Sequence, residues 1–275
     1  MPPTPIRRST IGGNPASLGL AMDLDRLERE IEAWSATGRH ATLWWRDDDA
    51  VAATPALARL LRLSDARGIP IALAVIPALA EPDLAQKIVD RERVTILQHG
   101  YAHKNHAAAG MRAVECGGNR PLDQIERELA LGRDRLSSLF GGRFLRVLVP
   151  PWNRIEPALV PRLPDLGFIG LSAWVTHEDR AAVPRLRQVD THADLIAWRK
   201  GRSFRGADRV IQALIAHLQA RREGREDPHE PTGLLTHHLV HDEASWRFLD
   251  ELSERLAPRA GLRWIGAPEA FSAPQ

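Results

Sequence analysis

The sequence predicts an α/β fold in which parallel strands form a barrel that is covered by helices. Short, continuously apolar segments alternate with longer segments of helical periodicity, which is typical of a buried parallel sheet. About seven such strand–helix units in one chain favour a barrel over an open sheet. Polar residues follow the ends of several predicted strands, where the active sites of (β/α) barrels are built.

The N-terminal half shows this alternation from residue 23 onwards. Residues 1–20 are rich in Pro, Ser, Thr and Gly and are expected to form a flexible arm, with one domain over 21–275. The first helix is predicted over 23–36 from apolar residues at helical spacing. The next elements are a strand at 41–46, a helix from Thr54-Pro55 to Gly68, a strand at 69–76, a short helix at 82–90 and a strand at 94–98.

The C-terminal half continues the pattern after a loop. The segment 106–120 is rich in Ala and Gly and is predicted to lie over the site. After it we expect a helix at 121–140, a strand at 146–149, a helix ending near Gly167, a strand at 168–172, a helix at 207–222, a polar loop at 223–231, a strand at 233–237, a helix at 243–256 and a strand at 262–265.

Composition excludes several classes of protein. Lys and Arg total 37 against 35 for Asp and Glu, a net charge of +2 that does not favour nucleic acid as a partner. Cys116 is the single cysteine, which excludes an intrachain disulfide and a cysteine-based zinc site. No segment approaches the roughly 20 apolar residues of a membrane span, and residues 1–14 lack the apolar core of a signal peptide. We therefore expect a soluble, cytoplasmic protein; composition leaves its oligomeric state open.

Two polar clusters at predicted strand ends supply the ligands for a divalent metal ion. Asp47, Asp48 and Asp49 follow one strand, and His99 and His103 follow another. Carboxylates with two imidazoles form the ligand set of a catalytic zinc or related ion with an open position for water. If the chain turns helical after the strand, the spacing of four places both rings on one face. The alternatives to a metal site are an exposed acidic turn for the three aspartates and a pair of surface or helix-capping histidines for His99 and His103.

The spacing leaves the individual roles open. One aspartate bound to the metal and its neighbour left free would place a ligand beside a general base. A histidine at the end of the strand near residue 237 can protonate a leaving group, because its ordinary pKa is about 6.5. Strand alternation points His237 and His238 to opposite sides, so one of them is expected to face the site. His106 is a further polar candidate near the metal.

The order of these motifs resembles the polysaccharide deacetylase family, the nodulation-protein-B-like group of carbohydrate esterase family four. The order is Asp-Asp, His-x-x-x-His, Pro-Pro-aromatic, a strand that ends in Trp, and Leu-x-x-His, over about residues 41–240. The resemblance implies a distorted (β/α) barrel with about seven parallel strands. It also implies hydrolysis of N- or O-acetyl groups on amino sugars, with zinc or a similar ion held by Asp-His-His.

The resemblance assigns roles to individual residues. Asp48 would be the catalytic base, and the metal ligands would be Asp49, His99 and His103. A shifted alignment would use Asp47 as the base and Asp48 as the ligand.

The last motif and the aromatic residues complete the implied site. The Leu-x-x-His element makes His237 the general acid, with His238 as the alternative. Substrate contacts are expected from Pro151, Trp152, Arg154 and Trp174, with the two tryptophans forming a wall on which a sugar ring could stack.

The chain departs from the family pattern in the third and fourth motifs. Val149 stands where the family has an arginine before Pro-Pro, and Arg154 or Arg146 could substitute for it. The two aspartates that precede the strand-end tryptophan are absent, so Asp194 or Asp242 would have to supply the charge beside the catalytic histidine.

The expected function is a metal-dependent hydrolase that removes an acetyl or other acyl group from an N-acetylated sugar or related amide through metal-activated water. Zinc is the first choice of metal, with cobalt, nickel or iron as alternatives. The competing hypotheses are an amidohydrolase for a non-sugar amide and a sugar-binding pseudoenzyme that has lost its chemistry.

Overall fold

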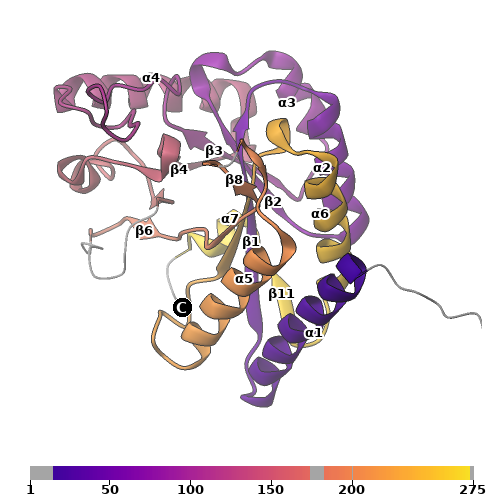
Figure 1. Cartoon of the computed structure of the whole chain (residues 1–275). Helices are drawn as coiled ribbons and strands as arrows, with labels where there is room; N and C mark the ends of the chain where they lie inside the picture. Colours follow the sequence, from indigo (N-terminus) through magenta and orange to yellow (C-terminus); the bar gives the residue numbers. More distant parts are fainter. Residues whose placement is uncertain (1–14, 174–182, 200, 273–275) are drawn as a thin grey trace, which may run out of the picture.

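A central sheet of parallel strands, surrounded by helices, forms the molecule in the computed structural model, which describes residues 15–173, 183–199 and 201–272 (Figure 1). The nine-stranded sheet has the order β6-β5-β4-β3-β2-β1-β10-β7, and β11 pairs with β1. Its strands are β1 (Ala41–Ala50), β2 (Ile71–Val75), β3 (Val94–His99), β4 (Phe144–Val149), β5 (Gly170–Leu171), β6 (Arg187–Gln188), β7 (Ala193–Asp194), β10 (Thr232–Thr236) and β11 (Leu262–Trp264). This confirms the predicted class, a distorted (β/α) barrel.

Helices cover the sheet, and a small hairpin lies near one end of it. The helices are α1 (Pro15–Ala36), α2 (Pro55–Arg67), α3 (Pro82–Ile88), α4 (Leu122–Phe140), α5 (Ala207–Arg222), α6 (Glu243–Arg255) and α7 (Ala267–Ala270). Short 3₁₀ turns are η1 (Pro77–Leu79), η2 (Gly141–Arg143), η3 (Pro151–Asn153), η4 (Pro157–Arg162) and η6 (His238–Val240). The hairpin strands β8 (Ile196–Ala197) and β9 (Ser203–Phe204) pair antiparallel.

Local signals set the ends of α2, as the sequence predicts. Thr54 Oγ1 accepts the N–H of Leu57 at 3.1 Å, and proline occupies the first helical position. Gly68 ends the helix in the left-handed conformation, with φ of 64°.

Two predicted elements differ from the structure. The helix expected before Gly167 is the 3₁₀ turn η4, which contains Pro161. Proline lacks the N–H that an α-helix needs, so the segment does not extend into a longer helix. Helix α1 begins at Pro15, so the end of the predicted flexible arm is helical.

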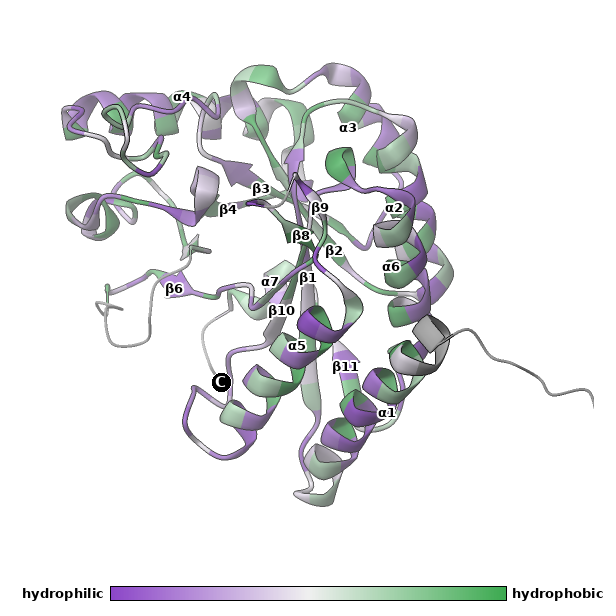
Figure 2. Ribbon diagram, in the orientation of Figure 1, coloured by the Kyte–Doolittle hydropathy of each residue, from purple (hydrophilic) through white to green (hydrophobic). Residues whose placement is uncertain are grey.

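Side chains of β1 alternate between two apolar layers. Leu43 and Trp45 belong to the large core between the sheet and the helices. Trp44 belongs to a second core inside the barrel, with Ala74 and Val149 of other strands. The helices carry green, apolar stretches as well as purple, polar ones in Figure 2, as expected for helices with one face on a sheet. The two layers define an inner and an outer face for every site residue on β1.

No helix in the described part of the chain is long and apolar enough to cross a membrane.

Candidate metal and catalytic site

The three aspartates lie within β1 rather than after it. The strand runs to Ala50, four residues beyond its predicted end. Because strand residues alternate in direction, Asp48 faces the barrel interior with Arg46, whereas Asp47 faces the outer layer with Trp45. The run of three carboxylates is therefore divided between two environments.

Asp47 forms a buried pair with His238 on the outer face. Its carboxylate accepts hydrogen bonds from Thr236 Oγ1 at 2.6 Å and from the backbone N–H of His238 at 3.0 Å, and it also contacts His238 Nδ1. Burial raises the pKa of Asp47, but His238 and Thr236 lower it by more. Burial in turn lowers the pKa of His238, and Asp47 more than reverses this. Asp47 and His238 therefore stabilise each other as a buried ion pair.

A bulge turns Asp49 toward the site. The register between β1 and β2 shifts between Asp47 and Ala50, and Asp49 has a φ of 69°. Bulges re-aim a side chain in this way, and aspartate tolerates the left-handed conformation better than most residues. Asp49 Oδ1 consequently lies 3.2 Å from His99 Nε2 and 3.4 Å from His103 Nε2.

The Asp49, His99 and His103 group fits a divalent cation. The three ligand atoms lie within 4.8 Å of one another, and Asp49 Oδ1 is buried without a hydrogen-bond partner. His99 Nδ1 lies 2.9 Å from Val149 O. A proton on Nδ1 can be donated to this carbonyl, and that tautomer leaves the Nε2 lone pair directed at the group.

Electrostatics at this group match the same interpretation. Burial raises the pKa of Asp49, but the close contact with His99 and the nearby histidine charges outweigh it and lower the pKa. Burial lowers the pKa of His99, yet the close contact with Asp49 and the Asp48 charge leave it raised. The pKa of His103 is lowered by burial and by the charge of His99. In the metal-free protein, His99 and Asp49 therefore form the pair that a cation would replace.

A tight turn, not a helix, joins the two histidines. Gly100 has a φ of 57° and His103 a φ of 55°, so the conditional expectation of a helix after the strand is wrong. The two imidazole rings are 5.1 Å apart, and the ring of Trp152 lies 4.4 Å from that of His103. We call residues 99–103 the histidine turn.

Arg46 holds Asp48 in place. Its Nε and Nη2 donate to the two carboxylate oxygens at 2.8 and 3.0 Å. Nη1 donates to Ser172 Oγ and Ser172 O, and Nη2 also donates to Asn153 Oδ1. These contacts use all five guanidinium donors, and neither Arg46 nor Asp48 is more than 3% exposed at its side chain. Among the described residues, Arg46 is therefore the arginine that pairs with Asp48.

The two arginines suggested as substitutes lie elsewhere in the structure. Arg154 Nη1 donates to Ala113 O at 2.7 Å, and Arg146 is exposed on β4. The sequence carried a signal for the pairing of Arg46 with Asp48, since the two residues are two apart on one strand and therefore share a face.

His237 faces Asp48 from β10, whose last residue is Thr236. Its Nε2 lies 3.9 Å from Asp48 Oδ2, and its ring meets the edge of Trp198 at 4.5 Å. Trp198, which the sequence analysis missed, donates its indole N–H to Asp194 at 2.7 Å. Asp194 therefore reaches His237 through an indole ring and not directly.

Asp242 does not supply a charge to His237 by direct contact. It caps α6 by accepting the N–H of Ser245 at 2.7 Å, and it accepts the N–H of Phe204 at 3.2 Å. His237 Nδ1 is buried without a hydrogen-bond partner.

Three of the four residues predicted to contact substrate lie together on the turn after β4, and the fourth lies outside the described residues. Pro151 is buried beside the histidine turn, and Trp152 is half-buried with a φ of 56°. Arg154 follows them on the same turn. Trp174 lies outside the described residues. His106 is half-buried, and its backbone N–H donates to Val114 O.

Beside this site, burial lowers the pKa of His241 to about 4, aided by the charges of His237 and His238. Below about pH 6.5 this histidine is protonated in the unfolded chain but stays neutral in the folded protein. The free energy of unfolding therefore decreases as the pH drops from 6.5 to 4. We expect His241→Gln to remove up to about 3 kcal/mol of this pH-dependent loss. Urea unfolding at pH 7 and at pH 4.5 gives the loss of unfolding free energy between the two pH values for each protein. A variant that loses as much as the wild type would contradict the assignment.

A second histidine group among the described residues fits a metal less well. His192, His217 and Glu230 also bring ligand atoms together. His192 Nδ1, however, accepts the N–H of Gly233 at 2.9 Å. A neutral imidazole that accepts at Nδ1 carries its proton on Nε2, and this nitrogen lies 3.9 Å from Glu230. The lone pair that a metal needs is therefore already in use.

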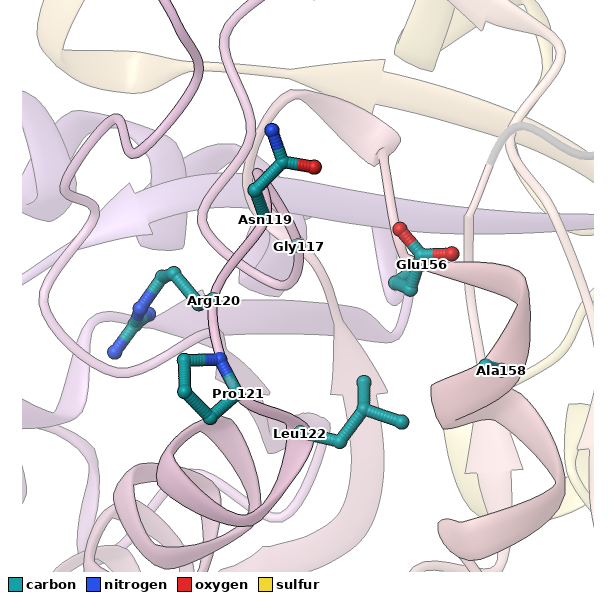
Figure 3. A pocket seen from close by; sticks show the side chains of 7 residues that line it. All are labelled: Gly117, Asn119, Arg120, Pro121, Leu122, Glu156 and Ala158. Carbon is teal, nitrogen blue, oxygen red and sulfur yellow. The ribbon is translucent and has the colours of Figure 1, made fainter.

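A surface hollow beside the 106–120 segment does not coincide with either group. Figure 3 shows Asn119, Arg120 and Pro121 on one side of it and Glu156 on the other. None of the predicted site residues lines it.

Comparison with known proteins gives structural relatives only. No family model and no curated protein matches the sequence. Eight of the solved structures that match are 11–18% identical in sequence to this chain. One is a peptidoglycan N-acetylglucosamine deacetylase, with a TM-score of 0.55 at 16% identity over 84% of this chain and 88% of that one.

Two other matches have the same fold. A family 4 acetyl xylan esterase from Clostridium thermocellum, in complex with a cobalt ion, has a TM-score of 0.50 at 16% identity, covering 84% of this chain and 90% of that one. A family 4 carbohydrate esterase pseudoenzyme from Bacillus anthracis has a TM-score of 0.51 at 14% identity, covering 85% and 66%. The resemblance that the motifs predict is thus confirmed for the fold: this chain has the fold of the polysaccharide deacetylases and family 4 carbohydrate esterases.

Proposed function

We propose that this protein is a metal-dependent hydrolase that removes an acetyl or related acyl group from the nitrogen of an N-acylated sugar or similar amide. The observation that carries the proposal is one constellation: the Asp49, His99 and His103 ligand atoms lie together, with Asp48 and His237 next to them. Ligands, a carboxylate base and an imidazole acid are the groups that amide hydrolysis requires.

The protein's own residues divide the proton transfers between them. A divalent ion held by Asp49, His99 and His103 supplies Lewis acidity for the scissile carbonyl and for water. Asp48, fixed by Arg46, accepts the proton of the attacking water. His237 donates a proton to the departing amine, and the 3.9 Å between its Nε2 and the Asp48 carboxylate leaves both groups within reach of one substrate.

Aromatic rings flank this centre on two sides. Trp152 packs on His103, and Trp198 packs on His237. Trp198 is 39% exposed, so part of its ring is available to a ligand. Flat apolar faces beside polar groups suit the apolar face of a sugar ring, which favours a carbohydrate over a compact polar amide.

The first experiment measures metal content. Purified wild-type protein, His99→Ala and His106→Ala are loaded with zinc, cobalt, nickel or iron, desalted and analysed by elemental mass spectrometry. We expect about one ion per chain in the wild type, as for a site with three protein ligands, its loss in His99→Ala, and retention in the matched control His106→Ala. A wild type that stays metal-free after loading would contradict the proposal.

The second experiment measures turnover. The metal-loaded protein is incubated with N-acetylated sugars, O-acetylated xylan fragments, ureides and simple amides, and released acid and amine are quantified. Release of acetate from an N-acetylated sugar supports the proposal, whereas release only from ureides or simple amides would identify an amidohydrolase. Sugar binding by an intact metal protein without any product would identify a pseudoenzyme, which the altered third and fourth motifs favour as the second candidate.

A further inference from the structure

A buried carboxylate from the 106–120 segment lies beneath the histidine turn. Glu115 is 2% exposed. Its Oε2 accepts the backbone N–H of Tyr101 at 2.9 Å, and its Oε1 accepts those of Ala102 at 2.8 Å and Lys104 at 3.1 Å. Two amides of the histidine turn and the amide of the residue that follows it thus point at a single anion.

Such an arrangement is an internal anion-binding nest. Successive backbone N–H groups in a turn with left-handed residues form a concavity that binds negative charge. Gly100 and His103 provide the left-handed conformations here. A Cβ at Gly100 would overlap Glu115 Oε2 and lie 2.6 Å from Pro151 Cδ, so the carboxylate can occupy the nest because residue 100 is glycine.

The rest of the molecule anchors Glu115 on its own side. Arg120 Nη1 donates to Glu115 O at 3.2 Å, and its Nη2 pairs with Glu128 of α4. The adjacent Cys116 O accepts the N–H of Glu156 at 2.7 Å. These contacts join the segment to α4 and to the chain after η3, beside the hollow of Figure 3. The backbone that carries the Glu115 side chain is therefore anchored by contacts outside the histidine turn.

We infer that Glu115 is a positioning residue that holds the histidine turn in its ligand-binding geometry before a metal arrives. The inference rests on the proposed function, because it takes His99 and His103 as metal ligands. Hydrogen bonds that orient ligands from outside the coordination shell typically change metal affinity by 10–100-fold. The segment 106–120, which the sequence predicts to lie over the site, thus supports the histidine turn through Glu115.

The first test replaces Glu115 by Gln, which keeps the shape but places an amide NH₂ where the turn presents N–H donors. Zinc affinity is measured by chelator competition and cobalt coordination by visible absorption. We expect zinc to bind about 10–100-fold more weakly and the cobalt spectrum to change. Glu156 is exposed, and its backbone N–H bonds to Cys116 O, next to Glu115. Glu156→Gln is therefore the matched control, and it should bind zinc and cobalt as the wild type does.

The second test needs no metal. Backbone hydrogen exchange in the metal-free wild type should show the amides of Tyr101, Ala102 and Lys104 protected, with protection lost in Glu115→Gln. Wild-type zinc affinity and an unchanged cobalt spectrum in Glu115→Gln would overturn the inference, as would unprotected amides in the wild type. If Glu115→Gln does not fold, the wild-type exchange rates decide.

The outcomes separate the proposed metal-dependent function from the positioning role of Glu115. A wild type that binds no metal refutes the proposed function, and its metal-free exchange rates still report whether Glu115 orders the turn. A wild type that binds metal, beside a variant that binds it equally well, refutes only the role of Glu115.

Discussion

Asp48→Asn should lower turnover by roughly 10²–10⁴-fold, the usual contribution of a general base, while about one metal ion per chain remains bound. The amide cannot accept the proton of water, yet Asp49, His99 and His103 are unchanged. Initial rates on the best acylated substrate, together with metal analysis of the same preparation, give the result. A variant that retains the wild-type rate would refute the role of Asp48 as base.

Asp47→Asn is the matched control for this prediction, since it makes the same change one residue earlier in β1. Asp47 pairs with His238 on the outer face, so this variant should lose stability but keep its rate per folded molecule. The opposite outcome, an inactive Asp47→Asn beside an active Asp48→Asn, would support the shifted alignment in which Asp47 is the base.

Arg46→Met should destabilise the fold by about 3–5 kcal/mol, because it leaves the Asp48 carboxylate buried without its cation. For a domain of this size the melting temperature should fall by roughly 6–20 °C. Arg46→Lys keeps the charge but cannot repeat the two-pronged contact, so its loss should be intermediate. Urea unfolding at pH 7 measures all three proteins.

The double variant Arg46→Met with Asp48→Asn separates the pair from general packing. If the pair interacts as the structure indicates, the double variant should be less destabilised than the sum of the two single variants. Additive losses would show that Arg46 stabilises the fold through Ser172 and Asn153 rather than through Asp48.

The sequence predicted the long helices and central strands well because their signals are local. The boundaries of α5 match the predicted range of 207–222, and α2 has the predicted caps. Strands such as β6 and β7 contain two residues each, too few to show any periodicity. Their positions depend on neighbouring strands, which the local sequence does not reveal.

The candidate site shows the same division. Motif spacing predicted that the three aspartates lie near His99 and His103, but three adjacent aspartates look alike in a sequence, and only the family resemblance selected Asp49 as the ligand. Their partners differ because strand alternation and the bulge at Asp49 send each carboxylate to a different neighbour. Glu115 was missed because its contacts are to backbone amides, which every residue offers.

The pairing of β1 has a consequence for how the chain folds. Its register places Asp47 opposite Thr236 and Ala41 opposite Leu262, contacts that span most of the sequence. Contacts between residues so distant in the chain slow folding, because a large loop must close before they form. During synthesis, Asp48 and His237 cannot meet until β10 has left the ribosome. The two residues proposed as base and acid therefore come together only after the strands between them have been synthesised, and those strands expose unpaired edges until then.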